Sequence, residues 1–167
     1  MAFFNSAGST LGQLIQTLPQ VGTVTWLGIR PERRGPLQEL EAVAALTDQG
    51  LAGDHYKGKP GSKRQVTLIQ AEHVAAVASL LHRPEIYPGL LRRNIVVLGI
   101  NLLALKDRQF RIGEALLEMT GLCHPCSRME ENLGPGGYNA MRGHGGITAR
   151  IITGGLIKVN DPVQIAP

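Results

Sequence analysis

The sequence predicts a mainly β fold of the α+β type, a closed or partly closed β-barrel of short strands with a covering helix and a short N-terminal helix. Short apolar runs rich in β-branched residues recur at even spacing along the chain. Glycine is frequent, at 21 of 167 residues, and aromatic residues make up only 4%, which suits many tight turns between small strands. Only residues 71–82 have the periodicity of a helix long enough to cover a sheet.

The chain length fits one domain with a sizeable core. Apolar residues recur at helical spacing between Leu11 and Leu18, and Pro19 ends this pattern. We therefore expect residues 1–20 to form an N-terminal helical extension and residues 21–167 to form the barrel domain.

The strands follow from alternating or β-branched apolar runs that end at turn residues. In chain order, the expected strands are residues 22–29, 65–70, 94–98, 101–105, 109–112, 115–120, 149–153, 156–159 and 163–165. Residues 40–46 fit either a helix or a strand. The dipeptide Gly154-Gly155 predicts a hairpin between the strands on either side of it. The glycine-rich segments 50–64 and 134–146 are expected to be loops.

The composition limits the classes of function. The net charge of +4 and the sequence pI of about 9.4 suit either a nucleic acid or a small anionic ligand. Because the arginines are scattered and not interleaved with aromatic residues, we expect no nucleic-acid partner. No apolar run approaches the roughly 20 residues of a membrane helix, and the N-terminus lacks the features of a secretory signal. With two cysteines and no disulfide framework, a cytoplasmic location is expected.

The two cysteines, Cys123 and Cys126, stand just after a predicted strand and beside basic residues. A second CxxC pair, which a four-cysteine zinc site needs, is absent from the sequence. The surroundings also lack the βαβ alternation of a thioredoxin-like redox pair. Two interpretations remain: a pair of small buried side chains, or one thiolate that is reactive or binds a metal.

Several polar residues stand at the ends of predicted strands. Asp54, His55 and Arg64 lie on the first glycine-rich loop, and Arg93 and Asn94 directly precede a strand. A guanidinium group at such a position could hold a phosphate or carboxylate with two hydrogen bonds, or it could simply lie at the surface.

The second glycine-rich segment contains Arg142, His144, Gly145 and Gly146. Glycines let backbone amides approach an anion closely, and a histidine could move a proton near neutral pH. The segment has no glycine–lysine–serine/threonine ending, and no dinucleotide fingerprint occurs in the right context, so nucleotide hydrolysis and Rossmann-type hydride transfer are disfavoured. A thiol, several arginines and glycine loops suit an anionic ligand that contains a soft atom.

The order of five segments resembles the MOSC domain family, which includes the C-terminal domain of molybdenum cofactor sulfurases. The segments are GLAGD at residues 50–54, KRQVTLIQAEHV at 63–74, RRNIVVLGINLLAL at 92–105, RIGEALLEMTGLCHPC at 111–126 and GGITARIITGGLIKVNDPVQI at 145–165. The resemblance covers residues 22–166. It implies a stand-alone β-rich barrel that binds the molybdenum cofactor, a pterin dithiolene with a phosphate tail.

The resemblance also implies roles for individual residues. Cys126 would ligate molybdenum or carry sulfur, whereas Cys123 has no firm counterpart in the family. Arg64, Arg93 and Asn94 fall where the family builds its anion-binding pocket. The residues themselves suggest a wider hypothesis, in which Arg64, Arg93 and Arg142 bind the phosphate or pterin, Asn94 makes a hydrogen bond and Asp54 fixes its loop. The cofactor would also meet His55, Gly145 and Gly146, and His144 would accompany Cys126 in catalysis.

Three functions stay open at this point. The chain could be an enzyme, either a molybdenum-dependent oxidoreductase that reduces N-hydroxylated compounds or a sulfurtransferase that carries a persulfide. It could instead store or deliver the cofactor without turnover, or be a basic nucleic-acid-binding barrel. No segment resembles the pyridoxal-phosphate domain of full-length sulfurases, so electrons or persulfide sulfur would come from a separate donor protein. A homodimer is compatible with the sequence, and a membrane partner is not expected.

Overall fold

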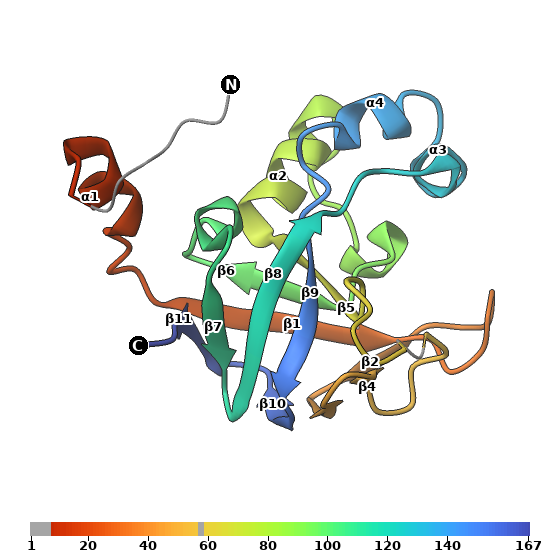
Figure 1. The fold of residues 1–167 in the computed structure, drawn as a ribbon. Coiled ribbons are helices and arrows are strands. Elements are labelled where there is room, and N and C mark those ends of the chain that lie inside the picture. Colours follow the sequence, from red (N-terminus) through yellow and green to blue (C-terminus); the bar gives the residue numbers. More distant parts are fainter. Residues whose placement is uncertain (1–7, 57–58) are drawn as a thin grey trace.

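The computed structural model describes residues 8–56 and 59–167. Figure 1 shows a barrel of strands with most of the helices gathered at one end. The strands are β1 (Gly22–Ile29), β2 (Gln38–Leu40), β3 (Ala42–Leu46), β4 (Gly50–Leu51), β5 (Val66–Gln70), β6 (Ile95–Leu98), β7 (Gln109–Ile112), β8 (Ala115–Leu122), β9 (Ile147–Thr153), β10 (Gly155–Lys158) and β11 (Pro162–Ile165). The α-helices are α1 (Thr10–Gln16), α2 (Ala71–Leu80), α3 (Ser127–Leu133) and α4 (Gly137–Met141), and the 3₁₀ helices are η1 (Pro88–Leu91) and η2 (Leu102–Leu105).

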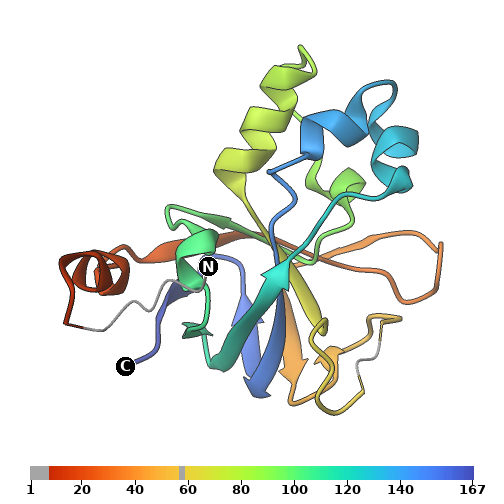
Figure 2. The same ribbon diagram turned by 45° about the horizontal axis from the view of Figure 1, so that its top comes forward.

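Seven strands close into a barrel in the order β11-β7-β8-β9-β5-β6-β1, because β1 pairs with β6 on one side and with β11 on the other. The pair β5–β6 is parallel and is connected through α2, and the other neighbours in the barrel are antiparallel. Strand β2 extends the sheet beyond β1, while β10, β3 and β4 form a separate three-stranded sheet. The predicted β-barrel with a covering helix is therefore confirmed, and it is closed (Figure 2).

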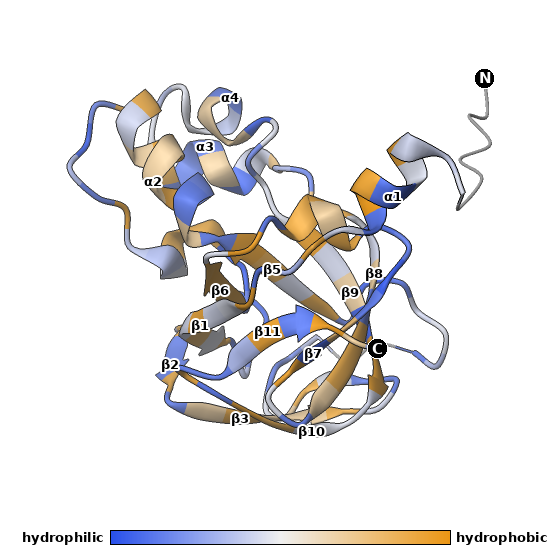
Figure 3. Cartoon of the chain, turned by 90° about the vertical axis from the view of Figure 1, so that its left-hand side faces the viewer, coloured by the Kyte–Doolittle hydropathy of each residue, from blue (hydrophilic) through white to orange (hydrophobic). Residues whose placement is uncertain are grey.

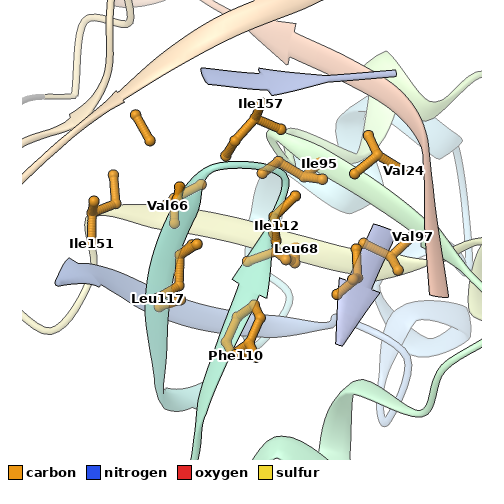
Figure 4. Packing of buried hydrophobic residues seen from close by; sticks show 14 of the residues in the cluster. Val24, Val66, Leu68, Ile95, Val97, Phe110, Ile112, Leu117, Ile151 and Ile157 are labelled. Carbon is orange, nitrogen blue, oxygen red and sulfur yellow. The ribbon is translucent and has the colours of Figure 1, made fainter. Parts of the chain in front are cut away.

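The barrel interior is filled by alternating aliphatic side chains from its strands and by Phe110 (Figure 4). All five residues of β5 are buried. Leu68 belongs to the core inside the barrel, and the next residue, Ile69, belongs to a second core between the barrel wall and the helices. Because successive side chains of a strand point to opposite faces, a strand covered on both sides reads as a continuous apolar run.

The second core lies under α2, α3, α4 and η1, and contains Val77, Leu91, Met129 and Met141. Figure 3 shows hydrophobic residues along the strands and along one side of α2, while most connecting loops are hydrophilic. Among the described residues, no helix has both the length and the apolar character needed to cross a membrane.

The N-terminal helix α1 is where the spacing of apolar residues predicts it, and the side chain of Ser9 accepts a hydrogen bond from Gly12 N at its start. Its apolar residues Leu11, Leu14 and Ile15 are exposed. The division into an extension of residues 1–20 and a barrel domain of residues 21–167 stays a prediction.

Two predicted elements are wrong. Residues 101–105 contain the 3₁₀ helix η2 instead of a strand, because the Asn101 side chain accepts a hydrogen bond from Leu103 N and begins a helical turn. The Gly154-Gly155 dipeptide does not join a hairpin, because β9 pairs with β5 and β8 while β10 pairs with β3. These glycines permit close packing: a Cβ at Gly154 would lie 2.6 Å from the Ala45 carbonyl oxygen.

Helices also occur where the sequence analysis expected none. The helix α3 follows Cys126 directly, and the segment 134–146, predicted to be a loop, contains the short helix α4. Carboxylate oxygens of Glu130 accept hydrogen bonds from Gly136 N and Tyr138 N, which fixes the turn between the two helices. The ambiguous residues 40–46 form the end of β2 and the strand β3.

The barrel core predicts the effect of one substitution. Phe110 is fully buried, so Phe110→Ala should lower the free energy of unfolding by about 3–5 kcal/mol, through lost burial and the cavity left behind. Urea denaturation measures this. The matched aromatic control Tyr138→Ala, at a side chain that is 41% exposed, should change it by only about 0.5 kcal/mol. Equal losses in the two variants would contradict the assigned core.

Candidate functional site

A cavity of about 360 Å³ lies at one end of the barrel, where β1 ends and where β5 and β6 begin. This volume falls near the lower limit of the roughly 300–1,000 Å³ typical of small-molecule sites. The cavity is lined by Gly28, Ile29, Arg30, Leu37, Asp54, His55, Tyr56, Arg64, Gln65, Val66, Thr67, Arg92, Arg93, Asn94, His124 and Cys126.

One wall of the cavity is a hydrogen-bond network centred on Asn94. Its side-chain oxygen accepts hydrogen bonds from Thr67 N at 3.2 Å and Thr67 Oγ1 at 3.1 Å. Its side-chain nitrogen donates to the Gly28 carbonyl at 3.1 Å and to Asp54 Oδ2 at 3.3 Å. The buried Asp54 also accepts from Arg30 N through Oδ1, at 3.0 Å. Asn94 and Asp54 therefore hold β1, β5 and β6 together at the cavity.

A second wall is fixed by Arg93, whose side chain is only 4% exposed. Its guanidinium donates from Nε to the Gly145 carbonyl at 2.7 Å, from Nη1 to the Leu91 carbonyl at 2.8 Å and from Nη2 to the Cys123 carbonyl at 3.3 Å. Burial lowers the pKa of Arg93; the nearby Cys123 thiol opposes this shift, and Arg64 adds to it. Three of its five N–H groups are thus committed to the backbone.

Three further guanidinium groups line the cavity, those of Arg30, Arg64 and Arg92. Arg30 donates to the carbonyls of Gly35 and Gly89, both at 3.2 Å, and so links the loop after β1 to η1. Burial and the neighbouring Arg92 lower the pKa of Arg30, while Asp54 raises it. Arg64 and Arg92 are exposed, so their donors face the cavity and solvent.

The cysteines differ in exposure. Cys123 is buried, with its backbone N–H bonded to the Gly146 carbonyl at 2.9 Å, and Cys126 is exposed where α3 begins. Both thiols are free. Only Cys126 lines the cavity of the four arginines. The site thus combines one accessible sulfur with several cationic groups, an arrangement suited to an anionic ligand and a soft metal.

The structure brings together six of the residues singled out from the sequence: Asp54, His55, Arg64, Arg93, Asn94 and Cys126. His55 Nδ1 lies 2.9 Å from the Arg30 carbonyl oxygen and 3.5 Å from Asp54 Oδ1, so this ring closes the edge of the network. The other four, Arg142, His144, Gly145 and Gly146, do not line the cavity. Arg142 is exposed at the end of α4 and bonds Asn139, and His144 packs on another histidine.

Gly145 and Gly146 line a second cavity, of about 200 Å³, on the other side of the Cys123 segment. Beside it the rings of His73 and His144 pack edge to face, with centroids 5.0 Å apart. Burial and the neighbouring His144 lower the pKa of His73. Both glycines are structurally required: a Cβ at either position would lie 2.0 Å from a backbone carbonyl oxygen, that of Cys123 or that of Leu68.

Sequence reasoning missed Arg30 and chose Arg93 over its neighbour Arg92. Arg30 directly follows an apolar strand, just as Arg64 and Arg93 precede one, and this is the signal that could have found it. Only the antiparallel pairing of β1 with β6, with Leu27 opposite Ile95, brings the end of one strand to the start of the other.

In the described residues, no group of three histidine, cysteine, aspartate or glutamate side chains is arranged to hold a metal ion.

Comparisons with known proteins agree with this fold. A family model described as MOSC domain matches residues 54–164. The YUAD protein from Bacillus subtilis has a similar structure, with a TM-score of 0.76 and 18% identity, covering 89% of this chain and 98% of that chain. YiiM from Geobacillus stearothermophilus gives a TM-score of 0.69 and 17% identity, covering 87% and 75%.

YiiM from Escherichia coli gives a TM-score of 0.66 and 18% identity, covering 87% of this chain and 70% of that chain. At these identities the likeness shows the fold alone. No curated protein matches the sequence.

The network around Asn94 predicts a structural effect. Asn94→Ala removes four hydrogen bonds and leaves partly buried partners unpaired, so the free energy of unfolding should fall by about 2–4 kcal/mol. Urea denaturation checks this. Asn139→Ala, at an exposed asparagine on α4, serves as the control and should cost about 0.5 kcal/mol or less. A similar small change in both variants would show that the network does not hold the strands together.

Proposed function

Because the chain belongs to the MOSC domain family, we propose that it binds the molybdenum cofactor in the cavity beside Cys126. The observation that carries this proposal is that an exposed thiol and four guanidinium groups share one cavity. Soft thiolate ligands suit a metal that is already bound to a dithiolene, and guanidinium groups bind phosphate with paired hydrogen bonds.

The chemical types of the residues that line the cavity support such a cofactor. Arg64 and Arg92 have no carbonyl partner among the hydrogen bonds of the described residues, so their donors are free to bind a phosphate tail. Arg30 and Arg93 use part of their donors on the backbone and add positive charge at fixed positions. The cofactor, when bound, would supply metal-centred redox or sulfur chemistry.

Cys126 has two candidate roles within this proposal. As a metal ligand it would hold the cofactor while N-hydroxylated compounds are reduced, with electrons from a separate protein. As a sulfur carrier it would receive persulfide sulfur from a donor and pass it to a metal cofactor. An exposed thiol at the start of α3 supports both roles, because each requires a sulfur atom that a large ligand or a partner can reach.

Elemental analysis after purification from a host that makes the cofactor tests the proposal. The unchanged protein should carry molybdenum close to one atom per chain. In Cys126→Ala the molybdenum content should fall at least about tenfold, because a metal ligand is lost. The matched control is Cys123→Ala, since Cys123 is buried and lies outside the arginine-lined cavity, and it should retain the metal.

The same preparations distinguish the remaining functions. Sulfur that cyanide releases from the unchanged protein but not from Cys126→Ala, with no bound molybdenum, would assign the carrier role. Tight cofactor binding that survives Cys126→Ala, without turnover with any electron donor, would assign storage or delivery. A protein with neither molybdenum nor labile sulfur would contradict the proposal.

A further inference from the structure

Two loops that line the cavity at their bases carry exposed positive charge at their tips. Residues 30–37 contribute Arg30 and Leu37 to the cavity, and residues 52–65 contribute Asp54, His55, Tyr56, Arg64 and Gln65. Arg33 and Arg34 stand at the first tip, Lys59 and Lys63 at the second, and all four are exposed. None of these four lines the cavity. We call these four residues the basic rim.

The positive charge of the chain is concentrated here. By sequence, segments 30–37, 52–65 and 92–93 hold nine of the 17 lysines and arginines but two of the 13 acidic residues, a formal charge of +7. The remainder therefore carries −3, against the total of +4. A predominantly positive surface around a cavity attracts partners of the opposite sign over distances near the Debye length, roughly 10 Å at 0.1 M salt.

The basic rim forms no ion pair within residues 8–56 and 59–167. Among the described residues, the ion pairs are His55–Asp54, Arg128–Glu131 and Arg150–Glu118, so none involves a rim residue. The acidic neighbours are few. Glu32 is exposed between the two prolines of its loop, and Asp48 accepts hydrogen bonds from Gly61 N at 3.5 Å and Gln65 Nε2 at 3.3 Å.

Both tips have a preset conformation. Gly35 N donates to the Glu32 carbonyl at 2.9 Å, and Ser62 N donates to the Lys59 carbonyl at 2.8 Å, so each tip is closed by a turn. Pro31, Pro36 and Pro60 restrict the backbone further. A surface that is ordered beforehand loses less entropy on binding than a flexible chain does. The backbone that carries Arg33, Arg34 and Lys59 is therefore ordered beside the cavity.

We infer that the basic rim is the docking surface for an acidic protein that delivers electrons or persulfide sulfur to Cys126. This inference rests on the proposed function, which requires a separate donor protein. Residues 31–36 and 59–64 contain neither an aromatic nor a large aliphatic side chain. Single-stranded nucleic acid needs aromatic platforms for its bases, and insertion into a membrane surface needs apolar side chains, so an acidic protein surface fits this rim best.

Association with a purified flavodoxin, an acidic one-electron carrier, tests the inference. Its binding rate to the unchanged protein should fall at least about tenfold between low and high ionic strength. The triple variant Arg33→Glu, Lys59→Glu, Lys63→Glu should bind at least about tenfold more slowly at low ionic strength. A flavodoxin whose carboxylates have been amidated should bind slowly to both proteins.

The matched control is Lys106→Glu, Arg111→Glu, Lys158→Glu, which changes the net charge equally at exposed residues away from the cavity. Its binding rate to flavodoxin should fall several-fold less than that of the rim variant. The inference would be overturned by an equal fall of the binding rate in the two triple variants, or by a binding rate that does not depend on ionic strength. Tighter binding to a short single-stranded DNA or to anionic phospholipid vesicles than to flavodoxin would overturn it as well.

Metal analysis of the same variants keeps this inference separate from the proposed function. The rim variant should retain its molybdenum, because none of its three positions lines the cavity. If the unchanged protein contains molybdenum but does not associate with flavodoxin, only the docking surface is contradicted. Association that persists in a protein without molybdenum or labile sulfur contradicts the proposed function alone.

Discussion

A buried guanidinium group holds one end of this barrel together. Arg93 is almost inaccessible to solvent, and it donates hydrogen bonds to the carbonyls of Leu91, Cys123 and Gly145. Leu91 ends the 3₁₀ helix η1, Cys123 directly follows β8, and Gly145 lies two residues before β9, so one side chain joins three segments at this end of the barrel. Burying a charge is costly unless its donors are satisfied, so the three carbonyl oxygens offset the loss of hydration. Because Arg93 also lines the cavity, these hydrogen bonds fix one wall of it.

The sequence predicted most of the fold because local patterns determine most of its elements. Residues 22–29 and 71–80 fold as expected, since β-branched residues favour a strand and apolar spacing of three and four favours a helix. One of the two errors arose where distant contacts decide the outcome. Gly154-Gly155 resembles a hairpin turn, yet the two flanking strands pair with different sheets, and nothing local reports which partner a strand will choose.

Local patterns also indicated which residues could lie at the site, but not what each of them does there. A polar residue directly beside an apolar strand is a local signal, and it drew attention to Arg64, Asn94 and Asp54, all of which line the cavity. It could not distinguish a ligand-binding residue from a structural one. Asn94 and Asp54 turned out to bond one another and the backbone, and only coordinates show which donors are already used. Arg142 has the right chemistry, but it lies at the exposed end of α4.

The hydrogen bonds of Arg93 also bear on the environments of the two thiols. The backbone of Cys123 is held on both sides, because its N–H donates to Gly146 and its carbonyl accepts from Arg93, so its side chain is buried. The chain then leaves the barrel wall, and three residues later Cys126 is exposed at the start of α3. Two cysteines only three residues apart thus lie in opposite environments, one buried and one exposed. Arg93 holds the backbone three residues before the exposed sulfur, while Arg64 and Arg92 leave their donors open to a ligand. Within one cavity, Arg93 therefore supports the backbone, whereas Arg64 and Arg92 keep donors for a ligand.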